Sequence, residues 1–161
     1  NLKPTYHSTQ TTTDDNFSSS PQPLVNNKKL NTGQQIDLNS ANENALKKVP
    51  GIGDTFAKRI AEYRTSLGGY TNIEQLMEVK GISEKKFEKI SVFFVIEKQH
   101  KKQSLPELIK SRHPYLNEKQ ILSINNCLKD GKQIKSVETL ESLEHFTPRD
   151  MERIKEYIRF K

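Results

Sequence analysis

Hydrophobic residues recur three and four positions apart from Ile36 to the end of the chain, the spacing expected of amphipathic helices. No stretch alternates as a half-buried strand would. The breaks in the pattern predict a short helix over 41–48 and a longer one from about Asp54 to Gly68-Gly69. A short helix ending near Glu78 and a fourth helix capped by Ser83 follow. The sequence therefore predicts an all-α fold.

Polar residues mark where these helices begin. Residues 40–43 and 71–74 each have the capping-box pattern, in which a hydroxyl accepts from the backbone and a glutamate three residues later bonds back. Residues 104–107 repeat that pattern, and 147–148 place a proline in the first turn of another helix. Pro50 ends the first helix, because proline disfavours helical geometry in the residue before it.

Residues 1–35 have a different composition. Nineteen of them are Ser, Thr, Asn or Gln, and three are proline. Such a segment buries too little apolar surface to offset the loss of backbone entropy, about 1–2 kcal/mol per residue. We expect a disordered tether, and a residual non-native tail would look the same in sequence. Because the first residue is Asn rather than Met, we also expect that an N-terminal piece has been removed.

The chain contains an internal repeat. A shift of 64 positions, without gaps, aligns helix caps with caps and apolar positions with apolar positions, which chance rarely gives at one fixed shift. The aligned pairs include Ser40/Ser104, Pro50/Pro114, Ile60/Ile124, Leu76/Leu140, Ser83/Thr147 and Ile90/Ile154. We therefore expect residues 99–161 to repeat the architecture of 36–98. The two copies should pack together or share a long helix over 94–102.

Two glycine turns lie about 30 residues apart in the first copy, at 50–54 and 79–83. Glycine allows positive φ and leaves the backbone amides without a side-chain wall. The start of a helix adds unpaired N–H donors and partial positive charge, so each turn is suited to a phosphate oxygen. In the second copy 115–117 and 144–146 replace these turns without glycine, and we expect phosphate binding there to be weak or lost.

These considerations define the expected phosphate-binding residues. They comprise the turn residues and nearby lysines: Gly51, Ile52, Gly53, Lys58, Lys80, Gly81, Ser83, Lys85 and Lys86. Lys48 and Arg59 could add charge at the rim. The alternative is that Gly-x-Gly is simply a tight helix–helix corner.

Composition narrows the function further. The longest mostly apolar run, 92–96, is far shorter than the roughly 20 residues of a membrane span. The net charge of +6 is a mild attraction to polyanions. One cysteine and four histidines give no zinc-ligand spacing, and Gly51 to Thr55 lacks the ending of a P-loop. We expect Cys127 to be a semi-buried packing residue at a helix end rather than a nucleophile, and His113 to lie in a surface turn. No cofactor, metal or small-molecule substrate is predicted.

The segment from Leu46 to Gly53, with Ala57, Ile60 and Tyr63-Arg64, resembles the helix-hairpin-helix motif. Residues 36–41 and 67–70 resemble the competence protein ComEA family. The resemblance covers 36 to about 96, and 99–161 resembles it only as a degenerate copy. It implies a compact all-α domain of two helix-hairpin-helix units. With the composition of 1–35 and the internal repeat, we expect tandem (helix-hairpin-helix)2 SAM-like domains: a tether over 1–35, a ComEA-like domain over 36–98, and a degenerate domain over 99–161.

The resemblance also implies a function. ComEA-like proteins bind double-stranded DNA through the minor groove and phosphates without reading sequence, and serve as DNA receptors during uptake. The family's phosphate-binding glycines correspond to Gly51, Gly53 and Gly81, whereas Ser83 stands where a second glycine is frequent. Other uptake or membrane proteins are further expected partners. The chain lacks the glycosylase-type loop with its catalytic Asp, so no enzyme is expected.

Two alternatives remain at this point. The same fold could serve as a protein–protein interaction scaffold, or as an accessory domain of a DNA-repair system. Two locations also remain, a membrane-anchored or exported protein with its anchor outside this chain, and a cytoplasmic one.

Overall fold

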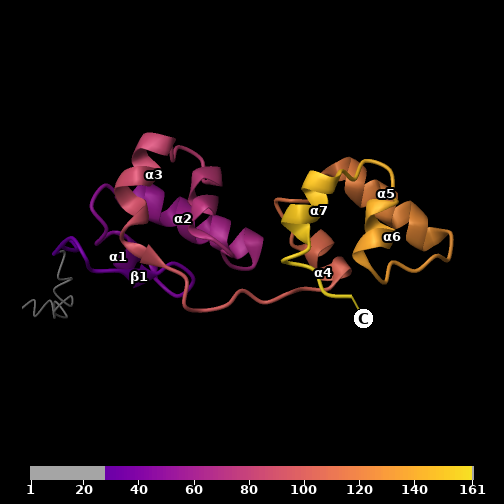
Figure 1. Ribbon diagram of the computed structural model, residues 1–161, viewed down its shortest axis with the longest axis horizontal. Coiled ribbons are helices and arrows are strands. Elements are labelled where there is room, and N and C mark those ends of the chain that lie inside the picture. Colours follow the sequence, from indigo (N-terminus) through magenta and orange to yellow (C-terminus); the bar gives the residue numbers. More distant parts are fainter. Residues whose placement is uncertain (1–27, 161) are drawn as a thin grey trace, which may run out of the picture.

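The computed structural model describes residues 28–160, so most of the expected tether lies outside the described residues. Figure 1 shows two groups of helices joined by an extended segment. The first group is made of β1 (Ile36–Asp37), α1 (Glu43–Leu46), α2 (Asp54–Leu67), the 3-10 helix η1 (Ile73–Glu78), α3 (Glu84–Ser91) and β2 (Phe94–Val95). The second is made of α4 (Leu105–Lys110), α5 (Glu118–Lys129), α6 (Val137–Glu141) and α7 (Pro148–Ile154). The chain is thus mostly helical.

A two-stranded parallel sheet is the feature that the hydrophobic pattern did not predict. Ile36 pairs with Phe94 and Asp37 with Val95. The Ile36 amide donates to the Phe93 carbonyl at 2.9 Å. This pairing requires extended backbone at 94–95, so the long helix expected over 94–102 does not form. Part of the expected tether is attached to the first half, because the Leu30 amide donates to the Lys48 carbonyl at 2.7 Å.

Helix caps follow the predicted chemistry, with two shifts in register. Asn42, not Ser40, caps α1, and Asn72 with Gln75, not Thr71 with Glu74, forms the capping box of η1. In both cases an asparagine next to the apolar stretch accepts from the third amide of the helix. The caps expected at 83, 104–107 and 147–148 are confirmed.

Each group of helices has its own fully buried residues. In the first these include Leu38, Leu46, Ile52, Ile60, Leu76 and Ile90; in the second, Leu108, Ile124, Leu140 and Ile154. Both members of three aligned pairs, Ile60/Ile124, Leu76/Leu140 and Ile90/Ile154, are thus buried.

A buried polar junction joins the halves on the η1 side of the first. The side chain of Gln75 donates to the hydroxyls of Tyr115 and Tyr157, at 2.7 Å each. His113 is fully buried, so its expected place in a surface turn is wrong. One of its ring nitrogens lies 3.0 Å from the Leu67 carbonyl, and the other accepts from the Tyr115 amide at 3.2 Å. These partners come from both halves, and sequence spacing alone did not reveal them.

Candidate nucleic-acid interface

The two glycine turns have the same backbone geometry. Gly51 and Gly81 have φ of +87° and +91°, in the left-handed region that favours glycine. The next residue in each turn, Ile52 or Ile82, is buried, and its amide bonds back to a carbonyl three residues earlier, at 3.1 and 3.0 Å. The apolar side chain anchors the turn while the glycine stays at the surface.

The start of α2 has no side-chain cap. Its N-cap residue is Gly53, whereas every other helix described in residues 28–160 begins at Asn, Ser or Thr. A Cβ placed on Gly53 would meet nothing within 4 Å, so the space beside Gly53 is open. The first-turn N–H groups of α2 therefore remain available to an external anion.

The start of α3 is more occupied. The Ser83 hydroxyl accepts from the Lys86 amide at 3.4 Å, a long hydrogen bond. Gly81 is exposed, but a Cβ there would lie 3.0 Å from an Arg59 nitrogen and 3.3 Å from the Phe56 ring. The second turn is thus a tighter version of the first.

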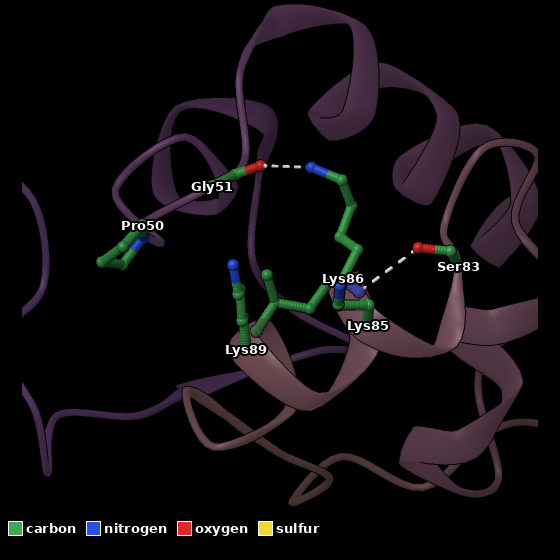
Figure 2. A pocket seen from close by; sticks show the side chains of 7 residues that line it. Pro50, Gly51, Ser83, Lys85, Lys86 and Lys89 are labelled. Atoms are coloured by element: carbon green, nitrogen blue, oxygen red, sulfur yellow. Dashed lines mark hydrogen bonds between the residues drawn. The ribbon is translucent and has the colours of Figure 1, made fainter.

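Two cationic side chains join the hairpins to one another through hydrogen bonds. From α3, the Lys86 ammonium donates to the Gly51 carbonyl at 3.1 Å (Figure 2). From α2, Arg59 donates to the Lys80 carbonyl, also at 3.1 Å. Phe56 lies beneath both, with the Lys86 ammonium 4.1 Å from its ring centroid. Each helix therefore holds the turn of the other hairpin.

An open hollow of about 390 Å³ lies between the first turn and the start of α3 (Figure 2). It is lined by Pro50, Gly51, Ser83, Lys85, Lys86, Lys89 and Ile90. Lys85 and Lys89 are exposed at its edge. Three lysines from one helix thus line the hollow beside the first turn, and the Lys86 ammonium contacts its backbone.

A second hollow, of about 250 Å³, is lined by the later residues of that turn. Gly53 and Asp54 line it together with Lys29, Lys47 and other residues. The Asp54 carboxylate would repel an anion at the start of α2. However, it forms an ion pair with the Lys47 ammonium at 2.9 Å, and this contact lowers the pKa of the Asp54 carboxyl. The negative charge nearest the open amides is therefore paired.

The structure gathers most, but not all, of the expected residues. Gly51, Ser83, Lys85 and Lys86 line the first hollow, Ile52 and Gly53 the second, and Gly81 borders Arg59 and Phe56. Lys80 lies in a separate depression with Arg59 and Tyr63. The Lys58 ammonium lies 3.9 Å from a carboxylate oxygen of Glu62 on α2, and Lys58 lines neither hollow.

Three basic residues were not predicted for the site. Lys89 lies one helical turn beyond Lys85, and that spacing could have revealed it. Lys47 could have been assigned to the site only by predicting its ion pair with Asp54. Lys29 lies in the polar N-terminal region and carried no signal in the sequence.

Other kinds of site have little support. Among residues 28–160 no group of three or more His, Cys, Asp or Glu is arranged to hold a metal ion. Within the same range no helix combines the length and apolar character needed to cross a bilayer. Cys127 is buried.

Comparison with known proteins finds the same motif. Residues 31–95 match the family model of the helix-hairpin-helix motif. ComE operon protein 1 of Bacillus subtilis is 38% identical over 58 residues, 36% of this chain and 28% of that protein. No solved structure matches the chain.

A second group of relatives has a different name. The endonuclease/exonuclease/phosphatase family domain-containing protein 1 of Danio rerio is 32% identical over 94 residues, 58% of this chain. The human protein of that name is 25% identical over an alignment that covers 84% of this chain. The matched regions are 16% and 28% of those two proteins, so the chain spans only a minor part of the relatives' length.

The matched family model covers both glycine turns, the helices they join and the strands that close the first half. Residues 31–95 of this chain therefore match the helix-hairpin-helix motif and are similar to ComE operon protein 1.

Proposed function

We propose that the first half of the chain binds double-stranded DNA without sequence preference. The observation that carries this proposal is the uncapped start of α2, exposed beside a lysine-lined hollow. Backbone N–H groups at Gly53 and in the first turn of α2 would bind one phosphate. Lys85, Lys86 and Lys89 would attract the neighbouring backbone. These groups read charge and spacing rather than bases.

The second turn is a weaker phosphate site in this proposal. Ser83 already occupies one amide at the start of α3, and Lys80 and Arg59 supply charge at the rim. The two turns are fastened by Lys86 and Arg59, so they present a fixed spacing to the phosphates. A fixed spacing favours a duplex over a flexible single strand.

We infer that residues 99–161 are a degenerate second copy. α5, α6 and α7 begin 64 residues after α2, η1 and α3. A parallel bridge between Gln103 and Ile158 corresponds to the pairing of β1 with β2. In this copy Asn117 and Gln120 form a capping box at the position of Gly53. The side chains of Asn117 and Gln120 therefore occupy amides at the start of α5 that would otherwise bind phosphate. This favours a role for the second half in binding protein rather than DNA.

Two biological settings follow from the relatives. The similarity to ComE operon protein 1 supports a DNA receptor in uptake. The alignment with the endonuclease/exonuclease/phosphatase family protein covers both halves. It supports a second candidate, a segment that holds a longer nucleic-acid enzyme on DNA.

The substitution Gly53→Asn tests the binding proposal. Gly53 (φ −107°, ψ −173°) and Asn117 (φ −89°, ψ 168°) have similar backbone angles, so the first turn accepts the cap that the second half already has. The new side chain would occupy one of the open amides in the first turn of α2. We expect thermal stability to be unchanged or higher and affinity for a random duplex of about 30 base pairs to fall about tenfold. Unchanged affinity, or no binding by the unsubstituted protein, would reject the proposal.

Asn117→Gly is the matched control. It removes the corresponding cap from the second half, and we expect it to leave DNA affinity unchanged. Opposite directions of stability and affinity in Gly53→Asn separate the loss of a phosphate site from a loss of folding.

A further inference from the structure

Lys29 lies beneath the first glycine turn, outside the segment that matches the family model. Its ammonium donates to three backbone carbonyls, those of Lys47, Val49 and Ile52. The distance to the Ile52 oxygen is 3.1 Å and to the Val49 oxygen 3.5 Å. A lysine ammonium has three donors, so one side chain satisfies three acceptors of a single turn.

The backbone next to Lys29 is itself fixed. The Leu30 amide donates to the Lys48 carbonyl at 2.7 Å, and the Leu30 side chain packs against the core. The lysine is thereby held against the turn by its neighbour. The contact between Lys29 and the first turn is therefore fixed by the packing of Leu30.

The contact with Ile52 determines where the next amide points. In a trans peptide the C=O and the N–H lie in one plane and point in opposite directions. Because the Ile52 carbonyl is directed at Lys29, the Gly53 N–H of the same peptide is directed away from it. In the described part of the chain the Gly53 amide has no backbone acceptor. Lys29 thus orients a free donor.

Lys29 also contributes charge where the turn is open. It lines the same hollow as Gly53 and Asp54. Lys47 is paired with Asp54, and Lys29 places a further positive charge near the start of α2.

We propose that Lys29 is a positioning residue for phosphate binding: it acts as a built-in cation that holds three turn carbonyls and directs the Gly53 amide outward. This inference rests on the proposed function. It extends the DNA-binding unit to residues that precede the family match.

Lys29→Met is the first test, with Lys28→Met as its matched control. Both remove one positive charge from adjacent positions, and Lys28 is exposed. We expect Lys28→Met to weaken binding about twofold and Lys29→Met about tenfold, measured by fluorescence anisotropy with a random duplex at constant ionic strength. Equal losses in the two variants would overturn the proposal.

Chemical rescue separates positioning from charge. Ammonium ions can occupy the vacated carbonyls of Lys29→Met, whereas tetramethylammonium has the same charge and no N–H donor. We expect ammonium to recover most of the lost affinity and tetramethylammonium, at the same ionic strength, to recover none. Equal effects of the two cations would contradict the assigned role.

Lys29→Arg provides the comparison if Lys29→Met loses its helical circular dichroism signal. Arginine keeps the charge, but its planar guanidinium cannot direct three donors at converging carbonyls. Affinity several-fold below that of the unsubstituted protein would support positioning, and equal affinity would refute it.

The Gly53 amide resonance is a readout that needs no DNA. It should shift in Lys29→Met and stay in place in Lys28→Met. If the chain does not bind DNA, the proposed function fails, but this resonance still reports whether Lys29 orients the amide.

Discussion

Lys86 of α3 and Gly51 of the opposite hairpin are joined by a hydrogen bond of 3.1 Å from ammonium to carbonyl oxygen. The same ammonium lies over the Phe56 ring. Lys86 thus fastens the turn and also lines the hollow beside it, whereas its neighbour Lys85 is exposed and only lines the hollow.

This difference predicts distinct effects for two adjacent lysines. Lys86→Met should lower the free energy of unfolding by about 1 kcal/mol, the usual contribution of one such hydrogen bond, and also weaken DNA binding. Lys85→Met should weaken binding but leave stability within about 0.5 kcal/mol. Urea denaturation and duplex titration of both variants measure this. Equal stabilities would show that the contact with Gly51 contributes little.

Salt dependence tests which lysines contact phosphate. Each phosphate contact releases counterions, so the logarithm of the association constant falls linearly with the logarithm of salt concentration. We expect Lys85→Met and Lys89→Met each to reduce the magnitude of that slope by about one. Lys58→Met should leave it unchanged, since Lys58 lies away from both hollows. An equal reduction by Lys58→Met would enlarge the interface beyond these residues.

Alanine at the turn glycines should separate backbone strain from open space. Gly51 and Gly81 have left-handed angles, which cost an L-residue about 1–2 kcal/mol, and at Gly81 a Cβ would also crowd Arg59 and Phe56. Gly81→Ala should therefore destabilise most, Gly51→Ala less, and Gly53→Ala least. Thermal unfolding gives the order. A Gly53→Ala variant as unstable as Gly81→Ala would contradict the open space at Gly53.

The buried His113 predicts how stability depends on pH. Burial lowers the pKa of His113 from 6.5 to about 4. The unfolded chain therefore binds the proton more readily between those values, and stability falls as the pH drops from about 6.5 to about 4. The full contribution is up to about 3 kcal/mol. Urea denaturation across this range measures it.

Two histidine variants control this measurement. His113→Asn should be less stable at neutral pH but should flatten the profile between pH 6.5 and 4. His145→Asn, at an exposed histidine, should keep the slope. A slope that survives in His113→Asn would assign the effect to other groups.

The junction predicts that the second half supports the second turn. Glu78, the last residue of η1, accepts from Tyr115 at 2.9 Å and from Arg153 at 2.8 Å, and Val79 follows it directly. Tyr115→Phe removes that bond and one partner of Gln75, at a cost of about 1–3 kcal/mol. Hydrogen exchange should accelerate at the amides of 79–82. Unchanged exchange there would mean that the turn is held by the first half alone.

The site could be predicted to the extent that it depends on local sequence. Positive φ at Gly51 and Gly81 and the buried isoleucines after them follow from a short motif, because local sterics determine such a turn. The Ser83 cap follows in the same way. The lysines on α3 were partly found: Lys85 and Lys86 are adjacent and follow the Ser83 cap closely, whereas placing Lys89 beside Lys85 required the helical period.

The rest depends on contacts between residues far apart in the chain. Ile36 and Phe94 pair over two residues, which is too short for an alternating pattern to be visible. His113 is buried by partners at Leu67 and Tyr115, so nothing beside Pro114 indicated its burial. Lys29 stands in a polar segment, and only the fold brings it under the turn.

The parallel ladder of β1 and β2 has a mechanical consequence. The chain enters the first half through one strand and leaves it through the neighbouring one, in the same direction. A pull on the two ends would therefore shear their hydrogen bonds together rather than open them one at a time. The two hairpin turns lie within the loop that the ladder closes, so a pull on β1 and β2 would bypass them until the ladder broke, whereas a pull through Lys29 and Leu30 would load the first turn.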